Sequence, residues 1–464
     1  MEDILKGLYS NKESLYWEDS LKFSFLIQKR LFKSIFVGDL KTALALQKLI
    51  INSNSSRLLA IRYVTQICVN RKMAGVDGKN SLTFVERFEL NEFLKLNVSN
   101  WFSQNFRSVS LLKNDNVVKK IKLSTISDRV WQFLITMAIE PIHEALFYPA
   151  SVGFRSGYNA FDVQKLIYFN LMSSANGLQK RCLIFNLKDC FIHYNLNYLL
   201  KKIIAPRSIK ISLNRLFSLG FPIQFSDEFD QKFNYNLESL CANILLNGIE
   251  LIHNSIRFGY FLAFFLNPLD NEKKILNFVY SELNIRGLEY KDLKITFVSS
   301  LDGFDFLGWN FKVLYNKNVY IVPALLEYQK FLRRLKHIIN NSNFGSTIKA
   351  NKIYPIIREW RLYHRFSSLV SSRFSLFLIK KRAFKIFSKE SRQDFYSTKR
   401  LLDKCFYILS DSDKIFYDFE KLKSPYFGHL TFRLNFKKNS FFNSNSMKNK
   451  IYLCFHCGMK SLFY

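Results

Sequence analysis

The sequence predicts an α+β protein in which helical segments flank a β-rich middle. Residues 18–70, and the segment that begins near residue 326, place apolar residues at helical spacing, as amphipathic helices do. Between them, residues 181–192, 256–266 and 294–312 are β-rich apolar runs. A chain of 464 residues is also too long for one compact core, so it should divide into roughly two to four domains.

The first helical region carries capping residues and many cations. Asp39 is a predicted N-cap, and Ser55 and Ser56 are predicted to cap a second helix, because short polar side chains satisfy the free amides of a first turn. The basic residues of this region fit either a solvated helix face or a surface that binds nucleic acid. They are Lys29, Arg30, Lys33, Lys41, Lys48, Arg57 and Arg62.

The middle of the chain is predicted to alternate turns with strands. Residues 71–130 mix polar turns with short strands, and glycine permits a tight turn within Ala74–Gly78. Residues 181–192 are predicted to form a mostly buried strand that runs toward a helix.

The net charge points to a polyanionic partner. The formal charge is +31, and residues 326–400 alone hold 18 Lys or Arg against 4 Asp or Glu. A field of this sign concentrates nucleic acid. Membrane binding is the alternative, but the sequence shows no basic amphipathic helix or lipid anchor, and no apolar run approaches the roughly 18 residues of a spanning helix.

The N-terminus and the cysteines bear on the compartment. The first residues lack the apolar core of a signal peptide and the Arg- and Ser-rich start of a transit peptide, so we expect the protein to act where it is made. Isolated cysteines such as Cys68 and Cys182 are typical of buried thiols in a reducing space. Heavy use of Phe, Lys, Ile and Asn indicates an AT-rich genome such as that of an organelle.

Several blocks, in order along the chain, resemble the reverse transcriptase-maturases of group II introns. Those resembling the family's N-terminal extension are Gln28–Lys33, Ala45–Leu49, Arg57–Gln66 and Ala74–Lys79. Those resembling its fingers, palm and thumb (the maturase domain, or domain X) are Ser127–Gln132, Ala138–Glu144, Gly153–Gly157, Phe304–Trp309 and Tyr354–Trp360 with Tyr363.

The resemblance implies a right-hand fold. Residues 1–100 would be the helical extension and the start of the fingers, and residues 101–322 the fingers and palm with an antiparallel sheet. Residues 323–405 would be the helical thumb, and residues 406–464 a basic tail.

The positions that carry polymerase chemistry in the family differ here. Where the family has its first palm aspartate and a second Asp six residues later, this chain has Asn186 and Ile192. The hairpin that reads Tyr-Ala-Asp-Asp in the family aligns with Phe258–Phe261, so Tyr260 and Phe261 replace both acids. The nucleotide-pocket block aligns with Lys232–Tyr235. Two-metal catalysis needs these carboxylates, so the resemblance implies a protein that is not a polymerase and uses no cofactor.

Other acids do not substitute for the lost carboxylates. Asp189 is offset by three residues from Asn186, which would place it on the opposite face of a strand, and Asp270 lies past the end of the hairpin. Because Phe258–Leu266 is almost wholly apolar, we expect aromatic side chains to fill the former metal cavity as packed core.

The functional signal then lies in the basic extension and thumb. We predict RNA contacts from Lys29, Arg30, Lys33, Arg57 and Arg62 in the extension. In the thumb the predicted contacts are Arg333, Arg334, Lys336, Arg358, Arg361, Arg365, Lys380, Lys381, Arg382 and Lys385. The nearby aromatics Tyr354, Trp360, Tyr363 and Phe366 either stack on unpaired bases or belong to a helix core, and core is favoured for Trp360.

The resemblance implies a splicing factor. The family's maturases bind intron RNA and hold it in its active shape, and the degenerate palm is most similar to those of maturase-like proteins of euglenoid plastids, which are associated with group II and group III introns. We therefore expect structured intron RNA as partner, no membrane or small-molecule substrate, and a plastid-encoded protein. The alternatives are an active reverse transcriptase of a mobile intron and a general RNA chaperone.

The C-terminus resembles the start of the family's HNH endonuclease appendix, through Ser424–Gly428 and Cys454–Gly458. A zinc site needs four ligands, and no Cys or His follows Cys457. The pair Cys454 and Cys457 is therefore predicted to be the vestige of a metal site, and the alternative is a zinc clasp that a distant residue such as His429 completes.

Overall fold

The computed structural model of the chain describes residues 2–112, 118–223, 225, 237–291, 293–391 and 394–406. Its helices are α1 (Glu2–Val37), α2 (Leu40–Asn52), α3 (Asn54–Arg62), α4 (Phe84–Asn97), α5 (Ile126–Leu146), α6 (Ala160–Leu171), α7 (Leu196–Lys202), α8 (Arg207–Ser218), α9 (Leu237–Leu246), α10 (Glu272–Ile285), α11 (Leu325–Asn340), α12 (Ser346–Tyr363), α13 (Val370–Ser391) and α14 (Phe395–Cys405). Its strands are β1 (Arg107–Leu112), β2 (Val118–Leu123), β3 (Arg181–Asn186), β4 (Ser255–Phe258), β5 (Phe261–Leu266), β6 (Lys294–Ser299), β7 (Phe304–Phe306), β8 (Trp309–Val313) and β9 (Val319–Pro323).

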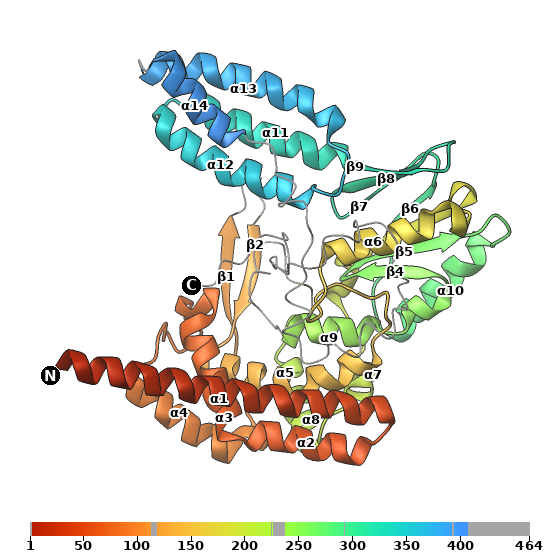
Figure 1. Ribbon diagram of the computed structural model, residues 1–464. Coiled ribbons are helices and arrows are strands. Elements are labelled where there is room, and N and C mark those ends of the chain that lie inside the picture. Colours follow the sequence, from red (N-terminus) through yellow and green to blue (C-terminus); the bar gives the residue numbers. More distant parts are fainter. Residues whose placement is uncertain are drawn as a thin grey trace.

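The arrangement is a mixed helix-and-sheet protein, as predicted. Figure 1 shows the N-terminal helices α1–α4 at one end and the C-terminal bundle α11–α14 at the opposite end. The antiparallel β1–β2 hairpin, the four-stranded central sheet in the order β4-β5-β3-β6, and the three-stranded sheet β7-β8-β9 lie between them. In the part of the chain that is described, no helix is both long and apolar enough to cross a bilayer.

The two inner strands of the central sheet, β3 and β5, are buried on both faces, whereas the edge strand β6 is largely exposed. Alternate side chains of β3 enter different cores, with Leu183 and Phe185 facing a core that includes α5 and α9, and Cys182 and Ile184 facing a core that includes α6 and the three-stranded sheet. Burial on both faces explains why β3 and β5 appear in the sequence as continuous apolar runs without alternation.

Local signals explain the N-terminal helices, with two corrections. The Asp39 side chain accepts a hydrogen bond from the Thr42 amide, as predicted for an N-cap. The cap of α3 is Ser53, not Ser55 or Ser56, and its side chain accepts from the Ser56 amide. Helix α4 lies where only turns and strands were predicted, and a capping box between Thr83 and Glu86 begins it.

The C-terminal bundle is joined to the three-stranded sheet by an aromatic junction. The Tyr363 ring stacks on Trp309 with centroids 4.5 Å apart and planes inclined by 3°. Its hydroxyl donates to the carbonyl of Leu307 over 2.7 Å. Leu307 has a φ of 48° and Gly308 a φ of 79° in the two-residue turn between β7 and β8, so the turn is of the kind with left-handed backbone at both positions.

One glycine lets two backbones approach each other beside the central sheet. The segment before α6 runs along β4, with the Val152 amide donating to the Arg257 carbonyl over 2.8 Å. A Cβ on Gly153 would lie 2.3 Å from the Gly259 amide nitrogen, in the turn between β4 and β5. Only a residue without a side chain fits there.

Gly153→Ser should therefore lower the free energy of unfolding by about 1–3 kcal/mol, because the new side chain forces the two backbones apart. The measurement is urea denaturation followed by circular dichroism. Gly345→Ser is the matched control, since a Cβ there meets nothing within 4 Å and the new hydroxyl suits the N-cap of α12. Equal losses in the two variants would contradict the close-approach explanation.

Candidate nucleic-acid interface

The three positions that the sequence analysis aligns with the family's acids lie together at one end of the central sheet. Asn186 is the last residue of β3 and pairs with Phe261 at the start of β5. The next amide, that of Leu187, donates to the Tyr260 carbonyl over 2.9 Å. The sequence alignment thus selected residues that are adjacent in space, although they are more than seventy positions apart in the chain.

Asn186 has a local structural role. Its side-chain oxygen accepts a hydrogen bond of 3.1 Å from the Lys188 amide, which begins the short 3₁₀ helix Lys188–Ile192. The strand therefore ends at Asn186, and the prediction that it continues to residue 192 is wrong. A polar side chain bonded to the backbone two residues ahead favours a turn over a continued ladder.

The two remaining acids of this region are engaged elsewhere. Asp189 lies in the 3₁₀ helix and forms an exposed ion pair of 3.8 Å with Lys294, so its displacement follows from the end of the strand and not from strand alternation. Asp270 accepts from the Asn267 amide over 2.6 Å at the other end of β5. Within the described ranges, no group of three or more His, Cys, Asp or Glu side chains is placed to hold a metal ion.

Aromatic rings surround the hairpin turn. Tyr260 and Phe261 have ring centroids 4.6 Å apart, Tyr260 lies 6.2 Å from Phe225, and Phe261 lies 5.9 Å from Phe306. Both hairpin rings are only half-buried, whereas the rest of β5, Leu262–Leu266, is fully buried. The expectation of a fully packed core thus holds for β5 and is wrong for the turn, whose rings lie at the edge of that core.

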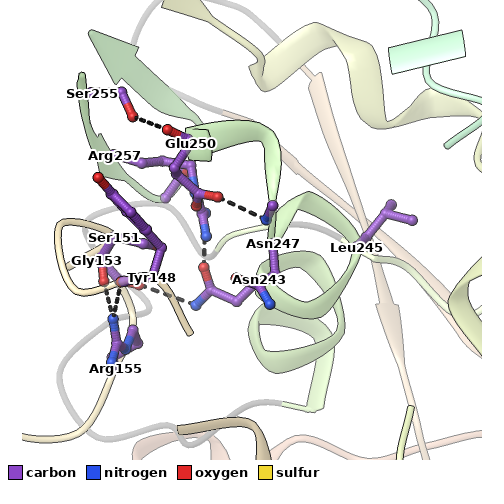
Figure 2. A network of polar contacts seen from close by, with 12 residues as sticks. Tyr148, Ser151, Gly153, Arg155, Asn243, Leu245, Asn247, Glu250, Ser255 and Arg257 are labelled. Atoms are coloured by element: carbon purple, nitrogen blue, oxygen red, sulfur yellow. Dashed lines mark hydrogen bonds and ion pairs between the residues drawn. The ribbon is translucent and has the colours of Figure 1, made fainter. Parts of the chain in front are cut away.

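A buried ion pair holds the hairpin in place (Figure 2). The guanidinium of Arg257, in β4, is bonded to the carboxylate of Glu250, and neither side chain has any exposed surface. Arg257 also donates to the Asn243 side chain over 2.9 Å and to the Gly259 carbonyl, inside the turn, over 3.0 Å. Asn243 in turn donates to the Gly153 carbonyl over 3.0 Å. One arginine thus links β4, α9, the turn and the segment before α6.

A second buried arginine continues this network. Arg155 donates from Nη2 to Glu144 of α5 over 2.7 Å, and from Nη1 to the Tyr148 carbonyl over 2.9 Å and to the Ser151 carbonyl. The Arg155 and Glu144 side chains are almost completely buried. Buried charges need such partners, because an unpaired charge in the interior is very costly.

The predicted cations of the N-terminal helices divide into two groups. Lys29, Arg30 and Lys33 are exposed and lie on the side of α1 away from its buried residues Ile27 and Leu31. They form what we call the α1 basic face.

Two other cations of this region have internal partners. Arg62 is half-buried, with its guanidinium 4.5 Å from the centre of the Trp17 ring. Arg57 is only 4% exposed and donates to the Asn52 carbonyl over 2.6 Å and to the Asn91 side chain over 3.3 Å. The prediction of Arg57 as a surface RNA contact is therefore wrong, because this side chain joins α3 to α4.

The predicted cations of the C-terminal bundle also divide. Arg333, Arg334, Lys336, Lys381, Arg382 and Lys385 are exposed, and Arg358, Arg361 and Lys380 are half-buried. Of these, Lys380 is paired with Asp403, and Arg382 donates to the Asn340 side chain over 3.2 Å. Of the exposed cations of α11, Arg333 and Lys336 are about 60° apart around the axis and share one side of the helix, whereas Arg334 lies about 100° from Arg333 on another side.

Arg365 is another correction. It is 7% exposed and lies at the aromatic junction, with its guanidinium 4.4 Å from the centre of the Phe161 ring and 4.9 Å from that of Phe366. The prediction of a surface contact is wrong here because Arg365 follows the end of α12, where the chain turns back toward the three-stranded sheet.

The aromatics predicted either to stack on bases or to form core belong to the core. Trp360 stacks on Phe331 with centroids 4.6 Å apart, and Tyr354 packs against the same bundle core. Tyr363 stacks on Trp309, and Phe366 meets Phe161 edge-on at 5.5 Å.

The exposed aromatics of the bundle are ones that the sequence reasoning missed. Phe374 and Phe377 of α13 are 68% and 60% exposed, and Val370 and Leu378 are exposed beside them. Lys381, Lys385 and Lys389 continue the same side of the helix. We call these seven residues the α13 stripe. Their i, i+3 and i, i+4 spacing was the signal that could have found them.

Three predicted features lie outside the described residues. They are the block Lys232–Tyr235, the block Ser424–Gly428 and the pair Cys454 and Cys457.

Phe261→Asp should lower the free energy of unfolding by about 1–3 kcal/mol, because a carboxylate would replace a ring packed against Phe306 at the core edge. Tyr260→Asp should have a smaller effect, since that ring belongs to the turn. The measurement is the shift of the urea midpoint, with Tyr315→Asp, at an 85% exposed position, as the control. A Phe261→Asp protein as stable as the parent would contradict the packing described here.

Arg257→Met should lower the free energy of unfolding by about 3–5 kcal/mol, because it leaves Glu250 charged and buried without its partner. Adding Glu250→Gln should restore much of the loss. Lys95→Met breaks the exposed 3.4 Å pair with Glu92 and should change stability by less than about 1 kcal/mol. Calorimetric melting measures the free energy of unfolding of the parent, the two single variants and the double variant. A double variant no more stable than Arg257→Met would count against the ion pair as the cause.

Comparison with known proteins places the chain in a family. Residues 13–94 match the family model described as the N-terminal domain of reverse transcriptase. A protein of Euglena gracilis named maturase-like protein 1 is 46% identical over 455 residues, which cover 97% of this chain and 97% of that protein. Its namesake from Euglena longa is 47% identical over 458 residues, 98% of each chain.

Among solved structures, telomerase from Candida albicans in complex with the TWJ fragment of telomeric RNA aligns over 71% of this chain and 68% of that chain, with 10% identity and a TM-score of 0.31. That likeness is too weak to indicate a shared architecture. The sequence relatives are decisive, because their identity of nearly one half extends over almost the whole chain. The protein therefore belongs to the family of maturase-like proteins of euglenoids.

Proposed function

We propose that this protein is a plastid maturase that binds structured intron RNA and assists the folding and excision of group II and group III introns. The observation that carries the proposal is the retention of two exposed basic surfaces, the α1 basic face and the cations of the bundle, on a family scaffold whose catalytic positions hold an amide and two aromatic rings. Lys and Arg side chains pair with phosphates, and phosphate contacts position a protein on nucleic acid.

The placement of the basic surfaces favours a large folded RNA. The α1 basic face lies in the N-terminal helices and the cations of α11 and α13 lie in the C-terminal bundle, at opposite ends of the protein (Figure 1). A short duplex would reach one surface, whereas a folded intron offers phosphates to both. In this proposal the RNA performs the chemistry, and the protein stabilises the RNA fold that is competent for it.

We further propose that the protein does not polymerise nucleotides. Two-metal catalysis requires carboxylates that hold Mg²⁺ near the attacking hydroxyl and the leaving group. Asn186 offers one neutral oxygen, which already accepts from Lys188, and Tyr260 and Phe261 offer no carboxylate. Primer extension on a homopolymer template with Mg²⁺ tests this, and template-directed DNA synthesis by the pure protein would refute it.

The domain assignment belongs to the same proposal. Residues 101–322 would serve as fingers and palm, and residues 323–405 as the thumb or maturase domain. Residues 1–100 would be the N-terminal extension with the start of the fingers, and residues 406–464 the basic tail with its vestigial Cys454 and Cys457.

Affinity for intron RNA should fall by roughly 10³-fold or more between 50 and 200 mM salt if about six phosphates are contacted. Filter binding across a salt series measures this. Lys29→Glu with Lys33→Glu should reduce the slope of log affinity against log salt by about 2, because two phosphate contacts are lost. Lys95→Glu, a cation beside Glu92 on α4, is the control and should leave the slope unchanged. Salt-insensitive binding would exclude the proposal.

A comparison of RNA ligands separates a maturase from a general RNA chaperone. A maturase should bind its intron more tightly than an unrelated structured RNA of the same length at the same salt concentration. Equal affinities would favour the chaperone, because phosphate contacts alone carry no sequence information. Sequencing the RNA that co-purifies with the protein identifies the intron to use.

A further inference from the structure

Among the described residues, the α13 stripe is an exposed surface that packs against no other element. The opposite side of α13 packs into the bundle core through Leu376, Ile379, Ala383 and Phe387, which are all buried. Helix α13 lies along the upper edge of the bundle in Figure 1. Phenylalanines that are 68% and 60% exposed leave much apolar surface in water, and a cluster of such residues marks an interaction site.

The charge around the stripe identifies the kind of partner. Residues 370–389 contain 6 Lys or Arg and no Asp or Glu. Helix α4 provides the contrast, because its exposed Phe84 and Phe88 lie among Glu86, Glu89 and Glu92. An apolar surface on a helical stretch that carries cations and no acids is complementary to a polyanion, and aromatic rings beside cations match a polyanion whose bases are accessible.

We propose that the α13 stripe binds an unpaired stretch of RNA, with Phe374 and Phe377 stacking on bases and Lys381, Lys385 and Lys389 contacting the phosphates that follow. The inference rests on the proposed function and adds the class of RNA element that the bundle recognises. The rings and the lysines follow one another along successive turns of one helix, about 5.4 Å apart. A single strand lying along the helix would meet the rings first and the lysines next.

The rings determine that the strand is unpaired. Within an RNA duplex the bases stack on each other and their faces are not available, whereas loops and bulges can place a base on an aromatic side chain. The lysines alone would serve either form, because phosphates are present in both. The α13 stripe therefore prefers loops, bulges and single-stranded junctions to continuous helices.

The test compares two RNA probes against a matched set of variants of the full chain. The probes are a 12-nucleotide oligoadenylate and a 12-base-pair RNA duplex, and binding is followed by fluorescence anisotropy at one salt concentration. The test variant is Phe374→Leu with Phe377→Leu, which keeps an apolar, helix-favouring residue at each position and removes the ring. The control is Phe84→Leu with Phe88→Leu, the exposed pair on acidic α4.

The test variant should bind oligoadenylate at least about 10-fold more weakly than the parent, since stacking on one ring contributes roughly 1–3 kcal/mol per base. Its affinity for the duplex should stay within about twofold, and the control should match the parent on both probes. Lys381→Glu with Lys385→Glu should weaken binding of both probes. All variants should fold, because the altered side chains are exposed. Thermal melting of each variant checks this.

The outcomes separate this inference from the proposed function. If the parent binds intron RNA with a steep salt dependence but the test variant binds oligoadenylate as the parent does, the α13 stripe is not a base-stacking surface and the proposed function stands. If the parent binds intron RNA but not oligoadenylate, the inference is likewise overturned. If the parent binds no RNA, both the inference and the proposed function are overturned. If the parent is a dimer, and Phe374→Ala with Phe377→Ala dissociates it without changing the RNA affinity, the α13 stripe is a protein interface and the inference is overturned.

Discussion

The buried pair of Arg257 and Glu250 is the constraint on which the centre of this protein depends. Two charges without water must satisfy each other, and their remaining donors and acceptors must find partners among nearby carbonyls and amides. That requirement fixes β4 against α9, holds the Gly259 carbonyl and, through Asn243, holds the Gly153 segment. The turn between β4 and β5 is thus held through its backbone, with the Gly259 carbonyl bonded to Arg257 and the Tyr260 carbonyl to the Leu187 amide. Because these bonds do not use the side chains of Tyr260 and Phe261, the side chains at the tip can differ without loss of the frame.

The replacements at the tip are consistent with that frame. Asn186 keeps a polar side chain where β3 ends, but uses it to begin a 3₁₀ helix. Tyr260 and Phe261 extend the apolar character of β5 outward as half-buried rings. The turn has no buried carboxylate of its own to balance, so it is stabilised by the packing of these rings together with the backbone hydrogen bonds of Gly259 and Tyr260.

Much of the fold was predictable from the sequence, because the apolar periods and several caps are local signals. Asp39 begins α2 as predicted, and the residues aligned with the family's catalytic positions meet at one end of the sheet. The corrections to the predicted RNA contacts share one cause, which is that residue type does not reveal burial. Arg57 and Arg365 resemble surface cations in the sequence, yet the fold surrounds the first with amide and carbonyl oxygens and the second with aromatic rings. For the same reason, the sequence analysis left a base-stacking role open for the aromatics of α12 and did not single out the exposed aromatics of α13.

The junction between Tyr363 and Trp309 has a consequence for how RNA would be recognised. Two parallel stacked rings, with a hydroxyl bonded to the backbone of a tight turn, leave little freedom for the bundle to swing relative to the sheet. The distance between the α1 basic face and the cations of the bundle then varies little. An RNA whose phosphates already match that distance can contact both basic surfaces at once, whereas a more flexible RNA must first bend to fit. Selection by shape can thus arise from a protein that reads no base sequence at its two ends.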